Sequence, residues 1–169
     1  GERPCSQLLE VGPGGGALTK FLKDMPGVEF RAVELDREKI DWLHQRYPDL
    51  KGRLMEGSIL DIPVPFEGRF TLVGNFPYNI SSQILFRVLE WRDQVECMVG
   101  MFQKEVGQRV AASPGKKDYG ILSVLVQAYY AVEYRFEVDE EAFDPPPKVK
   151  SAVIRLLDAG NPFGIKDDR

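Results

Sequence analysis

Three short segments of the sequence carry residue types that could bind a ligand and act on it. The first is the glycine-rich stretch EVGPGGGALT, in which Gly12, Gly14 and Gly16 follow an apolar run and precede a helical one. Glycines at such a turn let backbone N–H groups approach a ligand closely, and the start of a helix favours an anionic or carboxylate group. With Ala17 the spacing completes a dinucleotide-binding fingerprint, although a tight turn without a ligand would also explain these glycines.

The second segment ends in an acidic residue, Glu34, at the close of the next apolar run. It follows the glycines by about 20 residues, where a carboxylate can accept hydrogen bonds from the two ribose hydroxyls of an adenosine. The neighbouring Asp36 is better explained as the N-cap of the following helix. The glycine turn and the acid support each other as parts of one ligand site.

The third and most informative segment is GNFPYNIS, where Asn75, Pro77 and Tyr78 form an N-x-P-Y sequence. An amide oxygen and rigidly held backbone carbonyls can accept hydrogen bonds from an exocyclic amine, while the aromatic ring stacks on the base. Holding the amine hydrogens of an adenine N6 in this way would direct its lone pair toward an electrophile. A turn at the proline followed by a helix cap at Ser81 or Ser82 explains the same residues without chemistry.

Alternating strands and helices must position these segments, and the hydrophobic periodicity predicts such elements along the chain. Their order predicts an α/β fold with a mostly parallel, doubly wound, Rossmann-like sheet and an antiparallel C-terminal strand pair. Ligands bind such sheets at the carboxyl ends of the strands. The predicted strands are residues 7–11, 29–35, 53–57, 70–76, 95–102, 132–138 and 149–157, and the predicted helices are residues 16–24, 36–47, 81–91, 104–112 and 119–130.

Composition excludes several classes of protein. The 169 residues suit one domain, and 43% hydrophobic with 28% charged residues is typical of a globular chain. A net charge of −4 argues against binding of nucleic acid by bulk charge, although a local basic patch remains open. No apolar stretch approaches the roughly 20 residues of a membrane span, so we expect a cytoplasmic protein. Cys5 and Cys97 fit buried thiols better than a disulfide framework or a metal site.

The motifs together resemble the KsgA-type family of small-subunit (16S) rRNA adenine N6,N6-dimethyltransferases. The resemblance extends from about Leu8 to Leu157 and is carried by EVGPGGGALT, GNFPYNISSQILF, QKEVGQRVAASPGKKDYGILSV and FDPPPKVKSAV. It implies a Rossmann-like methyltransferase that uses S-adenosylmethionine, needs no metal and converts adenines of small-subunit rRNA to N6,N6-dimethyladenosine. The implied partner is the pre-30S ribosomal subunit, and we expect a monomer that does not bind membranes.

The resemblance also implies roles for particular residues. Asn75 would orient the target amine beside Pro77, Tyr78 would stack on the flipped adenine, and Phe143 would close the other face of that base. A loop hydrophobe covering the core is the alternative for Phe143. The implied cofactor-binding residues are Glu10, Gly12, Gly14, Gly16, Glu34, Leu35, Ser58, Ile59 and Asn75.

Two parts of the implied site are less direct. Ser58 stands where the family usually has an acid that contacts the cofactor adenine, and Asp61 is the nearest carboxylate that could substitute. The candidate RNA-binding residues lie in the second half of the chain, where a solvated charged surface would explain each of them equally well. They are Lys104, Arg109, Lys116, Lys117, Lys148 and Lys150.

Members of this family carry an N-terminal lid segment and a helical C-terminal domain, and neither is visible in the sequence. We therefore expect residues 1–169 to be a single catalytic domain. Two other functions stay open: a non-catalytic RNA-binding or ribosome-assembly module on the same fold, and an NAD-dependent dehydrogenase. The dehydrogenase leaves GNFPYNIS unexplained. An erythromycin-resistance type of methyltransferase, acting on large-subunit rRNA, shares the N-x-P-Y element, but FDPPPKVKSAV favours the small-subunit enzyme.

Overall fold

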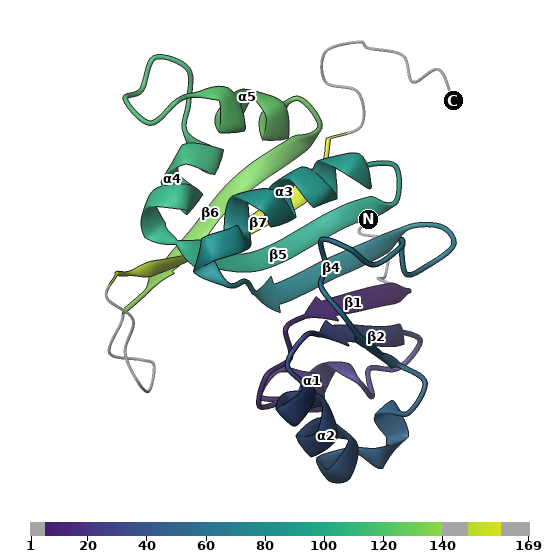
Figure 1. Cartoon of the computed structure of the whole chain (residues 1–169). Coiled ribbons are helices and arrows are strands. Elements are labelled where there is room, and N and C mark those ends of the chain that lie inside the picture. Colours follow the sequence, from purple (N-terminus) through teal and green to yellow (C-terminus); the bar gives the residue numbers. More distant parts are fainter. Residues whose placement is uncertain (1–5, 140–148, 160–169) are drawn as a thin grey trace.

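The computed structural model describes residues 6–139 and 149–159, which form a seven-stranded sheet with packed helices (Figure 1). The strand order is β3-β2-β1-β4-β5-β7-β6, with β1 to β5 parallel and β7 antiparallel to both of its neighbours. This is the predicted α/β architecture with its antiparallel C-terminal pair. The strands are β1 (Gln7–Val11), β2 (Glu29–Glu34), β3 (Leu54–Glu56), β4 (Phe70–Asn75), β5 (Val95–Gln103), β6 (Tyr130–Val138) and β7 (Ser151–Asp158). The helices are α1 (Thr19–Leu22), α2 (Arg37–Arg46), α3 (Ser81–Glu90), α4 (Lys104–Ala111) and α5 (Ile121–Gln127), with 3₁₀ turns η1 (Pro48–Leu50) and η2 (Tyr78–Ile80).

The direction of the chain across the sheet reverses at β1. From β1 the chain adds β2 and β3 on one side and then returns to place β4 on the other side. Val11 at the end of β1 pairs with Val33 of β2 and with Gly74 of β4. The segments that follow these three strands therefore meet at one edge of the sheet, where ligands of doubly wound folds bind.

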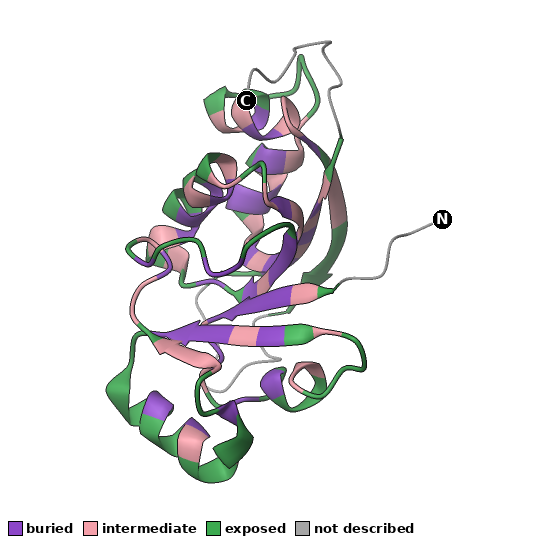
Figure 2. Cartoon of the chain, turned by 90° about the vertical axis from the view of Figure 1, so that its right-hand side faces the viewer, coloured by how far each residue is buried: buried purple, intermediate pink, exposed green. Residues whose placement is uncertain are grey.

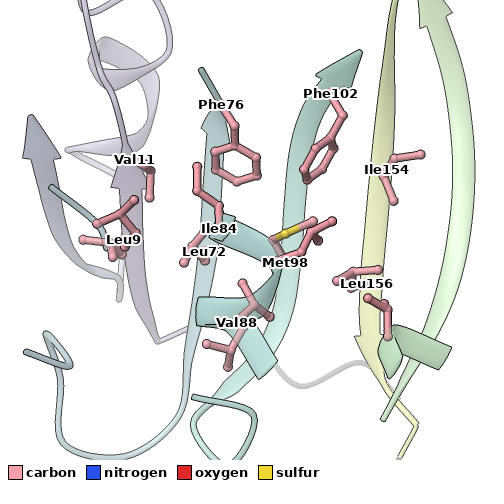
Figure 3. Close-up of a cluster of buried hydrophobic side chains, with 14 of the residues drawn as sticks. Leu9, Val11, Leu72, Phe76, Ile84, Val88, Met98, Phe102, Ile154 and Leu156 are labelled. Atoms are coloured by element: carbon pink, nitrogen blue, oxygen red, sulfur yellow. The ribbon is translucent and has the colours of Figure 1, made fainter. Parts of the chain in front are cut away.

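Both faces of the sheet carry buried apolar side chains, because successive residues of a strand point to opposite faces. Leu9 of β1 belongs to the larger hydrophobic cluster, beneath α3, α4 and α5, and Leu8 belongs to the smaller one, between β2 and α2. Figure 3 shows part of the larger cluster. In Figure 2 the buried residues gather on the strands, and many residues of the helices are exposed. The labelled residues of Figure 3 are Leu9, Val11, Leu72, Phe76, Ile84, Val88, Met98, Phe102, Ile154 and Leu156.

Helix boundaries differ from the prediction at the glycine turn and at α5, which is shorter than the predicted 119–130 because β6 begins at Tyr130. The predicted helix 16–24 is reduced to α1 (Thr19–Leu22), because Gly14 and Gly16 have positive φ angles of 54° and 77° and extend the turn. The predicted Asp36 cap of α2 is confirmed, since its Oδ1 accepts a hydrogen bond from the Glu38 backbone N–H at 3.0 Å.

Two smaller expectations are wrong for reasons visible in the structure. Neither Ser81 nor Ser82 caps α3: the N-cap position is Ile80, and the Ser81 hydroxyl donates to the Tyr78 carbonyl at 3.1 Å instead. Cys97 is half-buried rather than buried, because it alternates with the inward-facing Met98 on β5. Cys5 lies outside the described residues.

A buried aromatic ring fixes the end of β4. Phe76 is 1% exposed, and the centre of its ring lies 5.1 Å from that of Phe102 (Figure 3). The ring occupies space left by Gly74 and Gly100, which are paired across β4 and β5. A β-carbon on Gly100 would lie 2.2 Å from the Phe76 Cε2 atom. The core therefore determines where the residues on either side of Phe76 lie.

We expect Gly100→Ala to lower the free energy of unfolding by about 2–3 kcal/mol, because the added β-carbon overlaps the Phe76 ring. Urea denaturation measures the change. Gly15→Ala is the control, since Gly15 has open space around its β-position and should change stability by less than about 0.5 kcal/mol. Equal effects of the two substitutions would contradict this account of the packing.

Candidate active site

A cavity of about 790 Å³ opens at the carboxyl ends of β1, β2 and β4, where the strand order reverses. This volume lies within the range of roughly 300–1,000 Å³ that is typical of small-molecule sites. Its wall combines all three sequence segments that were expected to bind a ligand. The lining residues are Glu10, Gly12, Pro13, Gly14, Gly15, Ala17, Leu18, Phe21, Glu34, Lys39, Asn75, Phe76, Pro77, Tyr78 and Met101.

The structure brings only part of the predicted site to this cavity. Gly16 and the predicted residues Leu35, Ser58 and Ile59 do not line it. Phe143 and Lys148 lie outside the described residues, so their predicted roles stay predictions. The predicted residues that do line the cavity are Glu10, Gly12, Gly14, Glu34, Asn75, Pro77 and Tyr78.

Several lining residues were missed by the sequence reasoning. Lys39 comes from the exposed side of α2, and its position one turn after Asp36 was the only hint in the sequence. Phe21 is 67% exposed and lies in the predicted helix 16–24, whose apolar spacing gave no sign of the cavity. Met101 enters from β5, whose pairing with β4 is not readable locally.

The glycine turn is tied to β2 by its backbone. Gly12 has φ of 70°, which disfavours residues with a side chain, and its N–H donates to the Val33 carbonyl at 2.9 Å. The Gly14 N–H donates to the Glu34 carboxylate at 3.0 Å. The turn therefore lies against the end of β2, which keeps it at the cavity wall.

Glu34 is held in one orientation by three backbone donors. Besides the Gly14 N–H, the N–H groups of Leu35 and Asp36 donate to its second oxygen at 2.9 and 3.0 Å. The side chain is buried, at 7% exposure, yet lines the cavity. A carboxylate oxygen can accept two hydrogen bonds, so the oxygen that binds Gly14 keeps acceptor capacity for a ligand hydroxyl.

Glu10 is a second carboxyl group in the wall, on β1, where the strand order reverses. The buried Thr19 hydroxyl donates to its Oε1 at 2.5 Å. Burial raises the pKa of Glu10 to about 7, an increase that the Thr19 hydrogen bond opposes and the charge of Glu34 supports. The Glu34 carboxylate, together with Glu10 in its ionised form, favours a ligand with positive charge.

The N-x-P-Y turn offers an amide and a ring to the cavity. Its carbonyls at Pro77 and Tyr78 are engaged within the turn, by the Ile80 N–H at 3.2 Å and the Ser81 hydroxyl at 3.1 Å. Asn75 is exposed, and its side chain has no hydrogen-bonding partner within residues 6–139 and 149–159. Its amide oxygen is therefore an acceptor of this turn that is available to a substrate amine.

The Ser58 hydroxyl has a local role. It accepts a hydrogen bond from the Leu60 N–H at 3.1 Å, and the Ser58 carbonyl accepts from the N–H of Asp61 at 2.9 Å. Ser58 thus closes the turn after β3. Contact of Ser58 or Asp61 with a cofactor adenine stays a prediction.

Two of the predicted RNA-binding lysines are engaged with acids. Lys104 lies 3.3 Å from a Glu137 carboxylate oxygen, and Lys150 lies 3.8 Å from one of Asp139. The Lys104 ammonium contributes to a lowered pKa of Glu137, after the larger effect of the Tyr134 hydroxyl. The exposed basic residues of α4 and the connection to α5 are Arg109, Lys116 and Lys117.

Residues 6–139 and 149–159 contain neither a cluster of metal-binding side chains nor a membrane-spanning helix. In this part of the chain, no group of three or more His, Cys, Asp or Glu side chains could hold a metal ion. Within the same ranges, no helix has the length and apolar character needed to cross a membrane.

The strand order, with antiparallel β7 between β5 and β6, is that of a Rossmann-like methyltransferase fold of the S-adenosylmethionine-dependent class. The cavity lies where such sheets bind their ligands. The chain belongs to the ribosomal RNA adenine dimethylase family, whose sequence profile matches residues 3–167. This family assignment favours neither a dehydrogenase nor a non-catalytic module.

The chain is 56% identical over 151 residues to the ribosomal RNA small subunit methyltransferase A of Parabacteroides distasonis, covering 88% of this chain and 56% of that protein. A dimethyladenosine transferase from Plasmodium falciparum superposes with a TM-score of 0.79 at 30% identity, covering 90% of this chain and 55% of that one. The 23S rRNA methyltransferase ErmE superposes with a TM-score of 0.82 at 28% identity, covering 98% of this chain and 66% of that one. The chain spans somewhat over half the length of the curated relatives that it matches.

We expect the free energy of unfolding to fall between pH 4.5 and about 7, because folding raises the pKa of Glu10 across this window. Within this window the folded protein binds more protons than the unfolded chain. The stabilisation that comes from the proton on Glu10 is therefore fully present below pH 4.5 and is lost above about pH 7. Glu10→Gln imitates the protonated form. The free energy of unfolding of Glu10→Gln, relative to that of the wild type, should therefore increase by roughly 3 kcal/mol as the pH rises through this window.

Urea denaturation at several pH values tests this expectation. Glu67→Gln, at an exposed carboxylate, is the matched control and should show no such trend. A stability difference between Glu10→Gln and wild type that is independent of pH would show that Glu10 is not a buried, proton-retaining group.

Proposed function

We propose that this chain is the catalytic domain of an S-adenosylmethionine-dependent rRNA adenine dimethyltransferase. It transfers methyl groups to the N6 amines of adenines in small-subunit rRNA and produces N6,N6-dimethyladenosine. The observation that carries this proposal is that Asn75 and Tyr78 line the same cavity as the glycine turn and Glu34. Relatives at 50–56% identity that are named for the small subunit support this substrate over large-subunit rRNA.

The residues of the cavity fit S-adenosylmethionine. Glu34 would accept hydrogen bonds from the two ribose hydroxyls, since its carboxylate is held in place by backbone donors and keeps acceptor capacity. Gly12 and Gly14 let the backbone come close to the cofactor. Glu10 faces the cavity as a carboxyl group that suits a positively charged ligand. When bound, S-adenosylmethionine supplies a methyl group activated by an adjacent sulfonium.

Asn75 and Tyr78 would position the target adenine. The Asn75 amide oxygen accepts a hydrogen bond from the N6 amine and so turns the nitrogen lone pair toward the cofactor side of the cavity. The Tyr78 ring stacks on the base that is flipped out of the RNA. Such positioning lowers the barrier without a general base acting before the attack.

We infer that the partner is the pre-30S ribosomal subunit in the cytoplasm and that the protein acts as a monomer. Arg109, Lys116 and Lys117 are exposed on one connected region and suit contacts with RNA phosphates. Lys104 and Lys150 would have to leave their carboxylate partners to do the same.

We expect Asn75→Ala to reduce methyl transfer to small-subunit rRNA by at least about 100-fold, because the target amine loses its orienting acceptor. Binding of S-adenosylhomocysteine, measured by calorimetry, should change by less than about threefold. Asn79→Ala is the matched control, since Asn79 is exposed in the same turn but does not line the cavity. Parallel loss of transfer and of cofactor binding in Asn75→Ala would overturn this role for Asn75.

A further inference from the structure

A hydrogen bond between two hydroxyl groups joins the N-x-P-Y turn to the far half of the sheet. Tyr78 is the first residue of η2, and Ser151 is the first residue of β7. Their hydroxyls are hydrogen-bonded to each other although the residues are 73 positions apart in the sequence. Ser151 does not line the cavity, so its contact with Tyr78 is its link to the site.

Ser151 belongs to the packed interior of the sheet. It is fully buried, at 0% exposure, and its strand lies between two others, with Gln103 of β5 and Val138 of β6 as its paired residues. The next residue along β7, Ala152, is also fully buried in the core. A buried hydroxyl is costly unless it is hydrogen-bonded, and Tyr78 provides the partner.

The Tyr78 side chain is consequently held at both ends. At its backbone, the Ser81 hydroxyl donates to the Tyr78 carbonyl at 3.1 Å, and the Ile80 N–H closes the same turn. At its tip, the phenol hydroxyl meets Ser151. A ring fixed at its root and at its tip has little freedom about either side-chain torsion. Tyr78 lines the cavity and its hydroxyl is already engaged, so contact with a ligand falls to the rest of the residue.

We propose that Ser151 is a positioning residue that fixes the plane of the Tyr78 ring at the cavity, so that a flipped adenine meets an already ordered stacking surface. The inference rests on the proposed function in one respect, namely that the stacking partner is the target base. Binding of the base then costs no conformational entropy of the Tyr78 ring. The base also stacks in a fixed position, which places its amine at a constant distance from Asn75. Loss of the anchor should therefore slow methyl transfer without weakening cofactor binding.

The first test needs neither cofactor nor RNA. In the 169-residue chain, the ring resonances of Tyr78 are identified by their loss in Tyr78→Phe and then followed in Ser151→Ala by NMR. We expect these resonances to shift and to narrow as the ring gains mobility. Ser82→Ala, which removes an exposed hydroxyl from α3, should leave them unchanged. Unaltered Tyr78 resonances in Ser151→Ala would overturn the proposal.

The second test is a double-substitution cycle on methyl transfer. Ser151→Ala and Tyr78→Phe should each lower kcat by about three- to thirtyfold, with S-adenosylhomocysteine affinity changed by less than about twofold. The double variant should be no slower than the slower single variant, because both remove the same hydrogen bond. Multiplying losses would overturn the proposal. A wild-type chain that transfers no methyl groups would instead overturn the proposed function, while the ring resonances still decide whether Ser151 anchors Tyr78.

Discussion

The site depends on the hydrogen-bonded pairing of β1 with β2 on one side and β4 on the other. Because these three parallel strands end level with one another, with Val11 opposite both Val33 and Gly74, the residues that follow them share one edge. The glycine turn, Glu34 and Asn75 come from distant parts of the chain, yet none needs a long loop to reach the cavity. Backbone pairing thus brings the segments that form the wall of the cavity to one edge of the sheet.

Two kinds of packing then refine this edge. On one face, Phe76 fills the space beside Gly74 and Gly100, so the core holds the turn that presents Asn75. On the other, burial of Glu10 keeps a carboxyl group in the cavity wall at a cost in stability near neutral pH. Such a cost is typical of functional sites, where a buried ionisable group is retained for what it binds. Ser151 of β7 likewise links the buried sheet to a residue of the site, through its hydrogen bond with Tyr78.

The sequence predicted the strands, most helices and the shared edge, because these follow from local periodicity and from the rules of parallel sheets. It could not predict contacts between distant residues whose local surroundings are unremarkable. Gly100 lies in an ordinary apolar strand, and its need for glycine is visible only once Phe76 is placed against it. The pairing of Lys104 with Glu137 likewise depends on how β5, β7 and β6 align, so a patch predicted as basic is partly neutralised.

The central claim is that the cavity binds S-adenosylmethionine rather than a nicotinamide cofactor, and parallel calorimetric titrations test it most directly. The chain is titrated with S-adenosylhomocysteine, which avoids turnover, and separately with NADH. We expect saturable, one-to-one binding of S-adenosylhomocysteine and no binding of NADH. Binding of NADH alone, or of neither compound, would contradict it.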